Sequence, residues 1–205
     1  SVSLQSTTIL NLLCYMSPLS RVIRSNHGLA LHQPYARDKV QSILSSLNVA
    51  SHRPIPDNVK LKIGKNLHRV KYHPLHIIKS KIETFCSMYA KQQRYCSEFK
   101  IYDDLNPIVD IKSCFDDLCL PKNHVSRQSS DTYYLNDQLL LRTHTSAHQN
   151  HFISSGDDTF LCSGDVYRRD DIDSSHYPVF HQMEGVRIFK ELDYQNTNER
   201  INRMS

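Results

Sequence analysis

The sequence lacks the long apolar runs and cysteine pairs that mark several large classes of protein. No stretch of its 205 residues contains the roughly 18 or more consecutive apolar residues that a membrane-spanning helix requires. The longest apolar run near the N-terminus, residues 9–14, is broken by Asn11. The six cysteines form no CxxC pair, and the residues before them show no secretory signal with a clear cleavage box. These absences argue against a membrane span and favour free thiols in a reducing compartment.

The first 37 positions contain no acidic residue, and the first acid of the chain is Asp38. The same stretch contains Arg21, Arg24, Arg37 and many Ser and Thr residues. An acid-free segment rich in Arg and Ser is typical of a mitochondrial transit peptide, although an ordinary disordered tail has a similar composition. We therefore expect residues 1–50 to be a presequence and linker, and the mature protein to reside in the mitochondrial matrix.

The overall composition fits one further domain, which we assign to residues 51–205. Hydrophobic residues make up 39% of the chain and charged residues 22%, which is enough apolar material for a packed core. The net charge of +4 permits contact with a polyanion without requiring it. Lys and Arg cluster between Arg53 and Lys81. This cluster indicates either a solvated helix face or a surface that binds nucleic acid.

Two helices are expected before residue 95. Asp57 is a candidate N-cap for a helix with apolar residues at helical spacing. His73-Pro74 opens the second helix, because proline suits the first helical turn. The expected apolar positions are Val59, Ile63, Leu67 and Val70 in the first helix, and Leu75, Ile78, Ile82, Phe85 and Met88 in the second.

Strand patterns dominate the region after residue 130. Short strands are expected at Asp131–Leu135 and Leu139–Arg142, with a turn at Asn136-Asp137. A helix capped by Thr145 or Ser146 should run to about Ser155 and end at Gly156. Residues 160–168 and 179–189 read as two long strands joined by a charged loop, which predicts an antiparallel hairpin.

The expected hairpin concentrates polar groups on one of its faces. Residues two apart in a strand point the same way, so Gln182 and Glu184 share a face, as do Val166 and Arg168. A carboxylate, an amide and a guanidinium on one face suit a zwitterion together with a phosphate, which Arg binds in bidentate fashion. A salt-bridge cluster on a solvated sheet explains the same pattern equally well.

Two neighbouring segments could add to such a site. Residues 142–149 lie at a strand-to-helix junction, where free N–H groups suit a carboxylate or phosphate, and His144 and Ser146 flank that point. The polar loop 169–177 could cover a ligand or be a solvated turn. His144, His148 and His151 also have the i, i+4, i+7 spacing of a metal-dependent hydrolase, although no fourth ligand or catalytic Glu accompanies them.

The strings LRTHTSAHQ and GDVYRRDDIDSSHYPVFHQMEGVRIF resemble class II aminoacyl-tRNA synthetases of the mitochondrial phenylalanine type. The upstream strings GKNLH, HPLHIIK, IYDDLNPIVD, FDDLCLPKNHVSR and DTYYLN resemble the same family in the same order. The resemblance covers residues 58–189. It implies an α+β fold, with a class II synthetase-type antiparallel sheet flanked by helices that is incomplete here.

The resemblance assigns roles to individual residues. It implies that Arg168, the catalytic residue, holds the α-phosphate of ATP and the substrate carboxylate. Gln182 and Glu184, with Met183 between them, are implied to hold the amino group of phenylalanine. Phe180 is implied to stack on adenine. The remaining implied contacts are His144, Ser146, Ala147, His148 and Gln149 in the amino-acid site, and Asp170, Ser175, His176 and Tyr177 in the loop near ATP and the tRNA end.

The family resemblance also implies substrates and partners. These are phenylalanine, ATP with Mg²⁺ on its phosphates, and tRNA(Phe), used by a monomeric enzyme without a membrane partner. The glycine-rich third motif of the family, its phenyl-pocket wall and its anticodon-binding domain have no match here. A fragment, an incomplete gene model or a shortened isoform, with poor solubility, is therefore expected. A non-catalytic form that retains partial affinity for phenylalanine, ATP or tRNA is the alternative.

Overall fold

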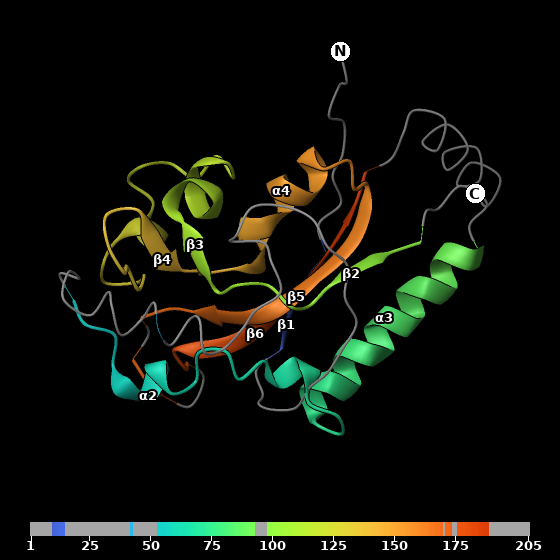
Figure 1. The fold of residues 1–205 in the computed structure, drawn as a ribbon, viewed down its shortest axis with the longest axis horizontal. Coiled ribbons are helices and arrows are strands. Elements are labelled where there is room, and N and C mark those ends of the chain that lie inside the picture. The colour runs from blue at the N-terminus through green and yellow to red at the C-terminus, as the bar shows by residue number, and fades with distance from the viewer. Residues whose placement is uncertain are drawn as a thin grey trace, which may run out of the picture.

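The computed structural model describes residues 10–14 (backbone only), 42, 53–92, 98–169, 171–173 and 176–188. Its centre is a four-stranded sheet in the order β1-β6-β5-β2, with a smaller two-stranded sheet, β3-β4, beside it (Figure 1). No helix in the described part of the chain is long and apolar enough to cross a membrane. The strands are β1 Leu10–Cys14, β2 Lys100–Tyr102, β3 Ile108–Asp110, β4 Leu139–Leu141, β5 Thr159–Tyr167 and β6 Val179–Arg187.

The predicted hairpin is confirmed as β5 and β6, which pair antiparallel along nine residues each. All nine residues of β5 are buried. The sheet is not wholly antiparallel, because β2 runs parallel to β5. The opposite edge is formed by β1, which pairs antiparallel with β6. The apolar run assigned to a presequence thus contributes a strand, while most of residues 1–50 lies outside the described residues and the presequence stays a prediction.

The predicted helix from Asp57 to Val70 is wrong. The helix α2 covers only Asp57–Lys60, and its N-cap is Pro56 rather than Asp57. Gly64 has a φ of 74° and Asn66 a φ of 44°, both in the left-handed region that a continuing right-handed helix excludes. A short 3-10 helix, η2, follows at Leu67–Arg69.

The second predicted helix is confirmed as α3, Pro74–Gln92. His73 prepares its first turn, because the N–H of Leu75 donates to His73 Nδ1 over 2.9 Å. The expected apolar face is buried only in part: Leu75 is buried, whereas Phe85 is 69% exposed and Met88 56%. A cavity lies between α3 and the sheet. Leu75, Ile78 and Ile82 of α3 line one side of it, and His181 and Met183 of β6 line the other.

The segment between β2 and β5 forms the upper lobe in Figure 1. The predicted strand Leu139–Arg142 is confirmed as β4, one residue shorter. Residues 131–135 form no strand and contribute one bridge, between Tyr134 and Leu140. The predicted turn is confirmed, since Asn136 Oδ1 accepts hydrogen bonds from the N–H groups of Gln138 and Leu139. A π-helical turn covers Lys112–Asp116, and a 3-10 turn, η4, covers Val125–Arg127.

The predicted helix after β4 forms in two parts. A 3-10 helix, η5, covers Thr145–His148, and α4 continues at Gln149–Ser154. Its end at Gly156 is confirmed, with a φ of 90° that favours glycine. The capping prediction is wrong: His144 is the N-cap and forms no side-chain cap bond. The hydroxyl of Ser146 donates instead to Glu184 on β6.

Three buried histidines lie where η2 and the start of α3 meet the sheet. The rings of His68 and His181 are 5.3 Å apart, and His73 precedes α3. Burial, followed by repulsion from His181 when that ring is protonated, lowers the pKa of His68 to about 3 and that of His73 to about 4. Burial likewise lowers the pKa of His181 to about 4, against the opposing charge of Asp165. All three side chains are therefore neutral in the folded chain near pH 7.

This cluster predicts acid sensitivity. The unfolded chain takes up protons on these histidines below about pH 6.5, whereas the folded chain resists protonation until about pH 4. Stability is therefore fully present above pH 6.5 and falls on acidification by about 1.4 kcal/mol per pH unit for each histidine. Urea unfolding between pH 7 and 4.5 should show a shallower decline for His68→Gln. The exposed His124→Gln control should decline as steeply as the wild type, and equal slopes for the two variants would refute the prediction.

Candidate functional site

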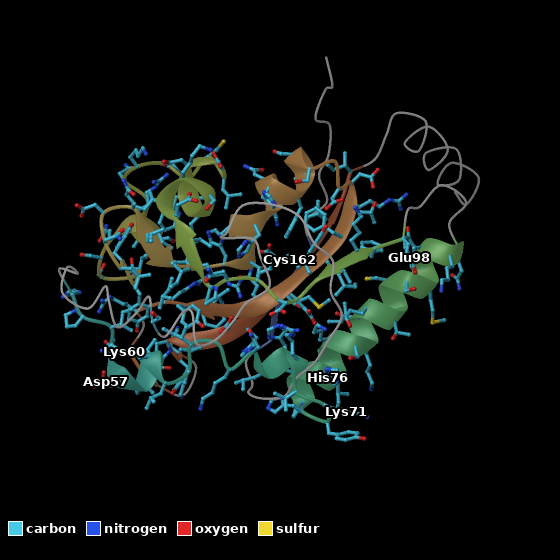
Figure 2. The ribbon with its side chains drawn as sticks, in the orientation of Figure 1. Asp57, Lys60, Lys71, His76, Glu98 and Cys162 are labelled. Carbon is cyan, nitrogen blue, oxygen red and sulfur yellow. The ribbon has the colours of Figure 1, made fainter. Side chains whose placement is uncertain are left out.

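The two faces of the β5–β6 hairpin serve different purposes. Ser163, His181 and Met183 point toward α3, where they line the cavity. Because side chains alternate along a strand, the even-numbered residues point the other way, toward η5 and α4. Residues directly opposite each other share a face, so Gly164 accompanies Gln182, and Cys162 accompanies Glu184. Cys162 lies near the middle of the sheet (Figure 2).

Glu184 is the centre of the polar face. Its side chain is buried, with 1% exposure. One carboxylate oxygen accepts from Ser146 Oγ at 2.7 Å and from Gln182 Nε2 at 2.6 Å, and the other accepts from Gln149 Nε2 at 2.8 Å. All three of these donors are neutral. No Lys or Arg in the described part of the chain forms an ion pair with Glu184. Burial therefore raises the pKa of Glu184, against the opposing effect of these hydrogen bonds.

Gln182 connects the hairpin to η5. Its amide nitrogen donates to Glu184, and its Oε1 accepts from the backbone N–H of Thr145 at 3.3 Å. Both ends of the amide are therefore occupied, which fixes its orientation. The sequence-based prediction that Gln182 and Glu184 share a face is confirmed. The structure brings them together with Ser146 and Gln149 from η5 and α4.

Arg168 follows β5 at the end of the same face. Its guanidinium lies 5.1 Å from the ring centroid of Phe180, and its Nε donates to Thr143 O at 3.4 Å. Within the part of the chain that the structure describes, its two terminal nitrogens have no hydrogen-bond acceptor. Arg168 therefore presents a cation whose outer edge is available to an anionic ligand.

His144, the N-cap residue of η5, lies near Arg168 and Phe115. Its ring centroid is 6.4 Å from that of Phe115 in an edge-on arrangement. Burial, followed by the charge of Arg168, lowers the pKa of His144 to about 4. The imidazole is therefore neutral near pH 7 and adds no second cation beside Arg168.

Other predicted site residues lie away from Glu184. Met183 points toward the α3 cavity, and Ala147 belongs to a hydrophobic cluster with Val109 and Leu140. In the loop, His176 is exposed and Nδ1 lies 2.8 Å from Asp173 Oδ2. Tyr177 contacts Lys62, whose Nζ lies 4.1 Å from the ring centroid. Asp170 and Ser175 lie outside the described residues, so their predicted roles stay predictions.

His148 belongs to a buried network that the sequence did not reveal. Its Nε2 lies 3.0 Å from Nη1 of Arg142, and neither side chain is more than 1% exposed. Arg142 forms an ion pair with Asp165 at 2.9 Å and also donates to the backbone oxygen of Asp165 at 2.7 Å. A lone Arg at the end of a predicted strand gave no signal of this pairing, because Asp165 is distant in sequence.

The histidine spacing does not create a metal site in the described part of the chain. No group of three or more His, Cys, Asp or Glu residues there is arranged to hold a metal ion. The three histidines make other contacts instead: His144 lies against Phe115, His148 against Arg142 and Phe152, and His151 against Phe152. The metal-dependent hydrolase therefore receives no support from the site geometry.

Known proteins supply an independent comparison. The family model described as "tRNA synthetases class II core domain (F)" matches residues 56–205. A phenylalanine–tRNA ligase, chloroplastic/mitochondrial, of Arabidopsis thaliana is 46% identical over 145 residues, covering 71% of this chain and 33% of that protein. The mitochondrial phenylalanine–tRNA ligase of Dictyostelium discoideum is 49% identical over 140 residues, covering 67% and 30%.

A third relative extends the match along the chain. The mitochondrial phenylalanine–tRNA ligase of Saccharomyces cerevisiae is 38% identical over 188 residues, covering 84% of this chain and 37% of that protein. The chain thus spans about a third of the length of these curated relatives. A solved pyrrolysyl tRNA synthetase of Desulfitobacterium hafniense aligns with a TM-score of 0.38 and 13% identity, over 89% of this chain and 68% of that chain, which adds no weight.

Proposed function

Because the chain belongs to the family of class II tRNA synthetase core domains, we propose that it carries the amino-acid-binding and ATP-binding wall of a phenylalanine–tRNA ligase. The observation that carries this proposal is the buried Glu184 carboxylate, held by neutral donors from three elements. A buried carboxylate without a cationic partner is costly, and the ammonium group of an amino acid would supply the missing charge. The relatives named phenylalanine–tRNA ligase support phenylalanine as that amino acid.

Arg168 acts on the other end of the substrate. Its guanidinium binds the α-phosphate of ATP and the carboxylate of phenylalanine, and it offsets the charge that builds on phosphorus. A carboxylate oxygen of phenylalanine attacks the α-phosphorus, and the bond to pyrophosphate breaks, giving phenylalanyl-adenylate. The 2′-hydroxyl of the terminal tRNA adenosine then attacks the acyl carbon, and AMP leaves. Catalysis by these residues is positioning and electrostatic stabilisation.

The polar face offers a stacking position for the adenine of ATP. Phe180 lies beside Arg168, where adenine would stack against an aromatic ring next to a phosphate-binding cation. No group of three or more potential metal ligands lies together in the described part of the chain. Mg²⁺ is proposed as a companion of ATP, where it would neutralise phosphate charge.

The cellular setting is proposed on the same basis. The names of the relatives and the acid-free first 37 residues support import into the mitochondrial matrix. The partner is tRNA(Phe), and the proposed active form is a monomer, as the resemblance to the mitochondrial family implies.

Phenylalanine-dependent exchange of pyrophosphate into ATP tests this function. We expect exchange by the wild-type chain to fall roughly a hundredfold or more in Arg168→Ala, because the phosphate-binding cation is lost. The Lys122→Ala control removes an 81%-exposed cation and should leave exchange unchanged. Phenylalanine binding by folded chain without any exchange would favour the non-catalytic alternative. Exchange that is insensitive to Arg168→Ala would contradict the proposed site.

A further inference from the structure

Arg142 joins three separate parts of the fold next to the polar face. Its guanidinium donates to the backbone and side chain of Asp165 on β5, at 2.7 and 2.9 Å. Nη1 also lies 3.0 Å from His148 Nε2 on η5, and 3.5 Å from the backbone oxygen of Leu105, which follows β2. The side chain is 1% exposed, so solvent cannot replace these contacts. Arg142 therefore fixes η5 against the hairpin.

Gly164 makes room for this arrangement. A Cβ built at Gly164 would lie 2.1 Å from Nη2 and 2.9 Å from Cζ of Arg142. Gly164 is the residue opposite Gln182, so the guanidinium lies on the same side of the hairpin as the polar face. Because Arg142 is buried and held by several partners, any side chain at position 164 must displace it. The glycine is explained by the close approach of the guanidinium.

The segment that Arg142 anchors also carries the partners of Glu184. His148 is the last residue of η5; Ser146 lies two residues before it, and Gln149 follows directly. Ser146 and Gln149 donate to opposite oxygens of the Glu184 carboxylate, at 2.7 and 2.8 Å. A shift of η5 would therefore disturb both hydrogen bonds at once. The charge of Arg142 also opposes the rise that burial causes in the pKa of Glu184, which favours the ionised carboxylate.

We propose that Arg142 is a positioning residue for ammonium recognition. It occupies the space that Gly164 leaves and acts through His148 to keep Ser146 and Gln149 hydrogen-bonded to Glu184. This inference rests on the proposed function, in which Glu184 binds the substrate ammonium group. It assigns Arg142 no contact with the substrate. Its effect should therefore be confined to the part of the binding energy that depends on the ammonium group.

Two ligands separate this role from a general structural one. L-phenylalanine carries the ammonium group, whereas 3-phenylpropanoate has the same phenyl and carboxylate groups without it. Equilibrium dialysis of the full chain with each ligand gives the ratio of the two affinities. The variants are Arg142→Lys, which retains the charge but loses the bidentate geometry, and Gly164→Ala, which displaces the guanidinium. Gly185→Ala is the matched control, because its Cβ meets only the side-chain end of Leu161 at 3.1 Å.

The expected result is a loss confined to phenylalanine. Arg142→Lys and Gly164→Ala should weaken its binding roughly ten- to a hundredfold, while binding of 3-phenylpropanoate changes less than about twofold. His148→Gln, whose amide oxygen can replace Nε2 as the acceptor, should retain the wild-type ratio. His148→Leu, which cannot accept a hydrogen bond, should lower the ratio of phenylalanine affinity to 3-phenylpropanoate affinity. Gly185→Ala should retain the ratio.

Each alternative outcome counts against the inference. Equal losses for both ligands, or a Gly164→Ala chain that behaves like Gly185→Ala, would assign Arg142 a purely structural role. Variants at positions 142, 148 and 164 that all fail to fold, judged by circular dichroism, would lead to the same conclusion. A wild-type chain that binds phenylalanine no better than 3-phenylpropanoate would overturn the proposed function itself, and this inference with it.

Discussion

Replacing Glu184 with glutamine is expected to stabilise the free chain at neutral pH and to weaken its binding of phenylalanine by roughly a hundredfold or more. Glutamine has nearly the same shape but carries no charge into a site with 1% exposure. Gln149 can rotate its amide to face the new NH₂ group, while Ser146 and Gln182 still donate to the remaining oxygen. The stability gain is expected to be on the order of 1 kcal/mol.

The pH dependence of this gain has a definite sign. Burial raises the pKa of Glu184 above its ordinary value of 4.5. The folded chain therefore holds this proton more tightly than the unfolded chain, and the cost of ionisation is absent below pH 4.5. That cost grows as the pH rises through the folded value, so Glu184→Gln should exceed the wild type in stability at pH 7 but not at pH 4.

Urea unfolding at these two pH values, together with phenylalanine binding, measures both effects. The matched control is Glu98→Gln, which removes a carboxylate from an exposed position (Figure 2). It should change neither stability nor binding appreciably. A Glu184→Gln chain that is less stable than the wild type at pH 7, or that binds phenylalanine with unchanged affinity, would contradict the assignment.

The second large effect concerns the ion pair beneath the site. Burial alone would raise the pKa of Asp165, but the charge of Arg142, followed by that of His181 once it is protonated in acid, holds this pKa below its usual range. Tyr167 Oη donates to the same carboxylate. Arg142→Met leaves this buried charge without its main partner, and we expect a loss of about 3–5 kcal/mol in the free energy of unfolding.

Exposed and buried pairs in this chain offer a direct comparison. Lys122→Met breaks the pair with Asp116, in which the lysine side chain is 81% exposed. It should cost far less stability, because solvent screens the pair and Arg127 still contacts Asp116. The double variant Arg142→Met, Asp165→Leu should recover part of the loss, because no buried charge remains. Urea unfolding compares the three chains. An Arg142→Met chain within about 1 kcal/mol of the wild type would show that the pair contributes little.

The hairpin and its polar face could be predicted because both depend on local patterns. A period of two places Gln182 and Glu184 on one side of any strand, and the strings around them identify the family without further information. Helix α3 was equally readable from Pro74 and the spacing of its apolar residues. The error at Asp57–Val70 arose because apolar spacing outweighed Gly64 and Asn66, whose left-handed conformations end the helix.

Pairings between distant segments could not be predicted. The parallel pairing of β2 with β5 joins residues near 100 to residues near 160, and no local sequence pattern predicts this pairing. The same holds for Arg142 and Asp165, and for the hydroxyl of Ser146, which hydrogen-bonds Glu184 rather than capping its own helix. The site depends on these long-range contacts, so its residues could be named from sequence but not its geometry.

A crystal structure of the chain with a non-hydrolysable phenylalanyl-adenylate analogue would test the central claim most directly. The claim predicts the ligand ammonium nitrogen about 2.7–2.9 Å from the Glu184 carboxylate. It also predicts phosphate oxygens on the free edge of Arg168 and the adenine ring beside Phe180. An analogue bound elsewhere, or bound with its ammonium group turned away from Glu184, would contradict the account.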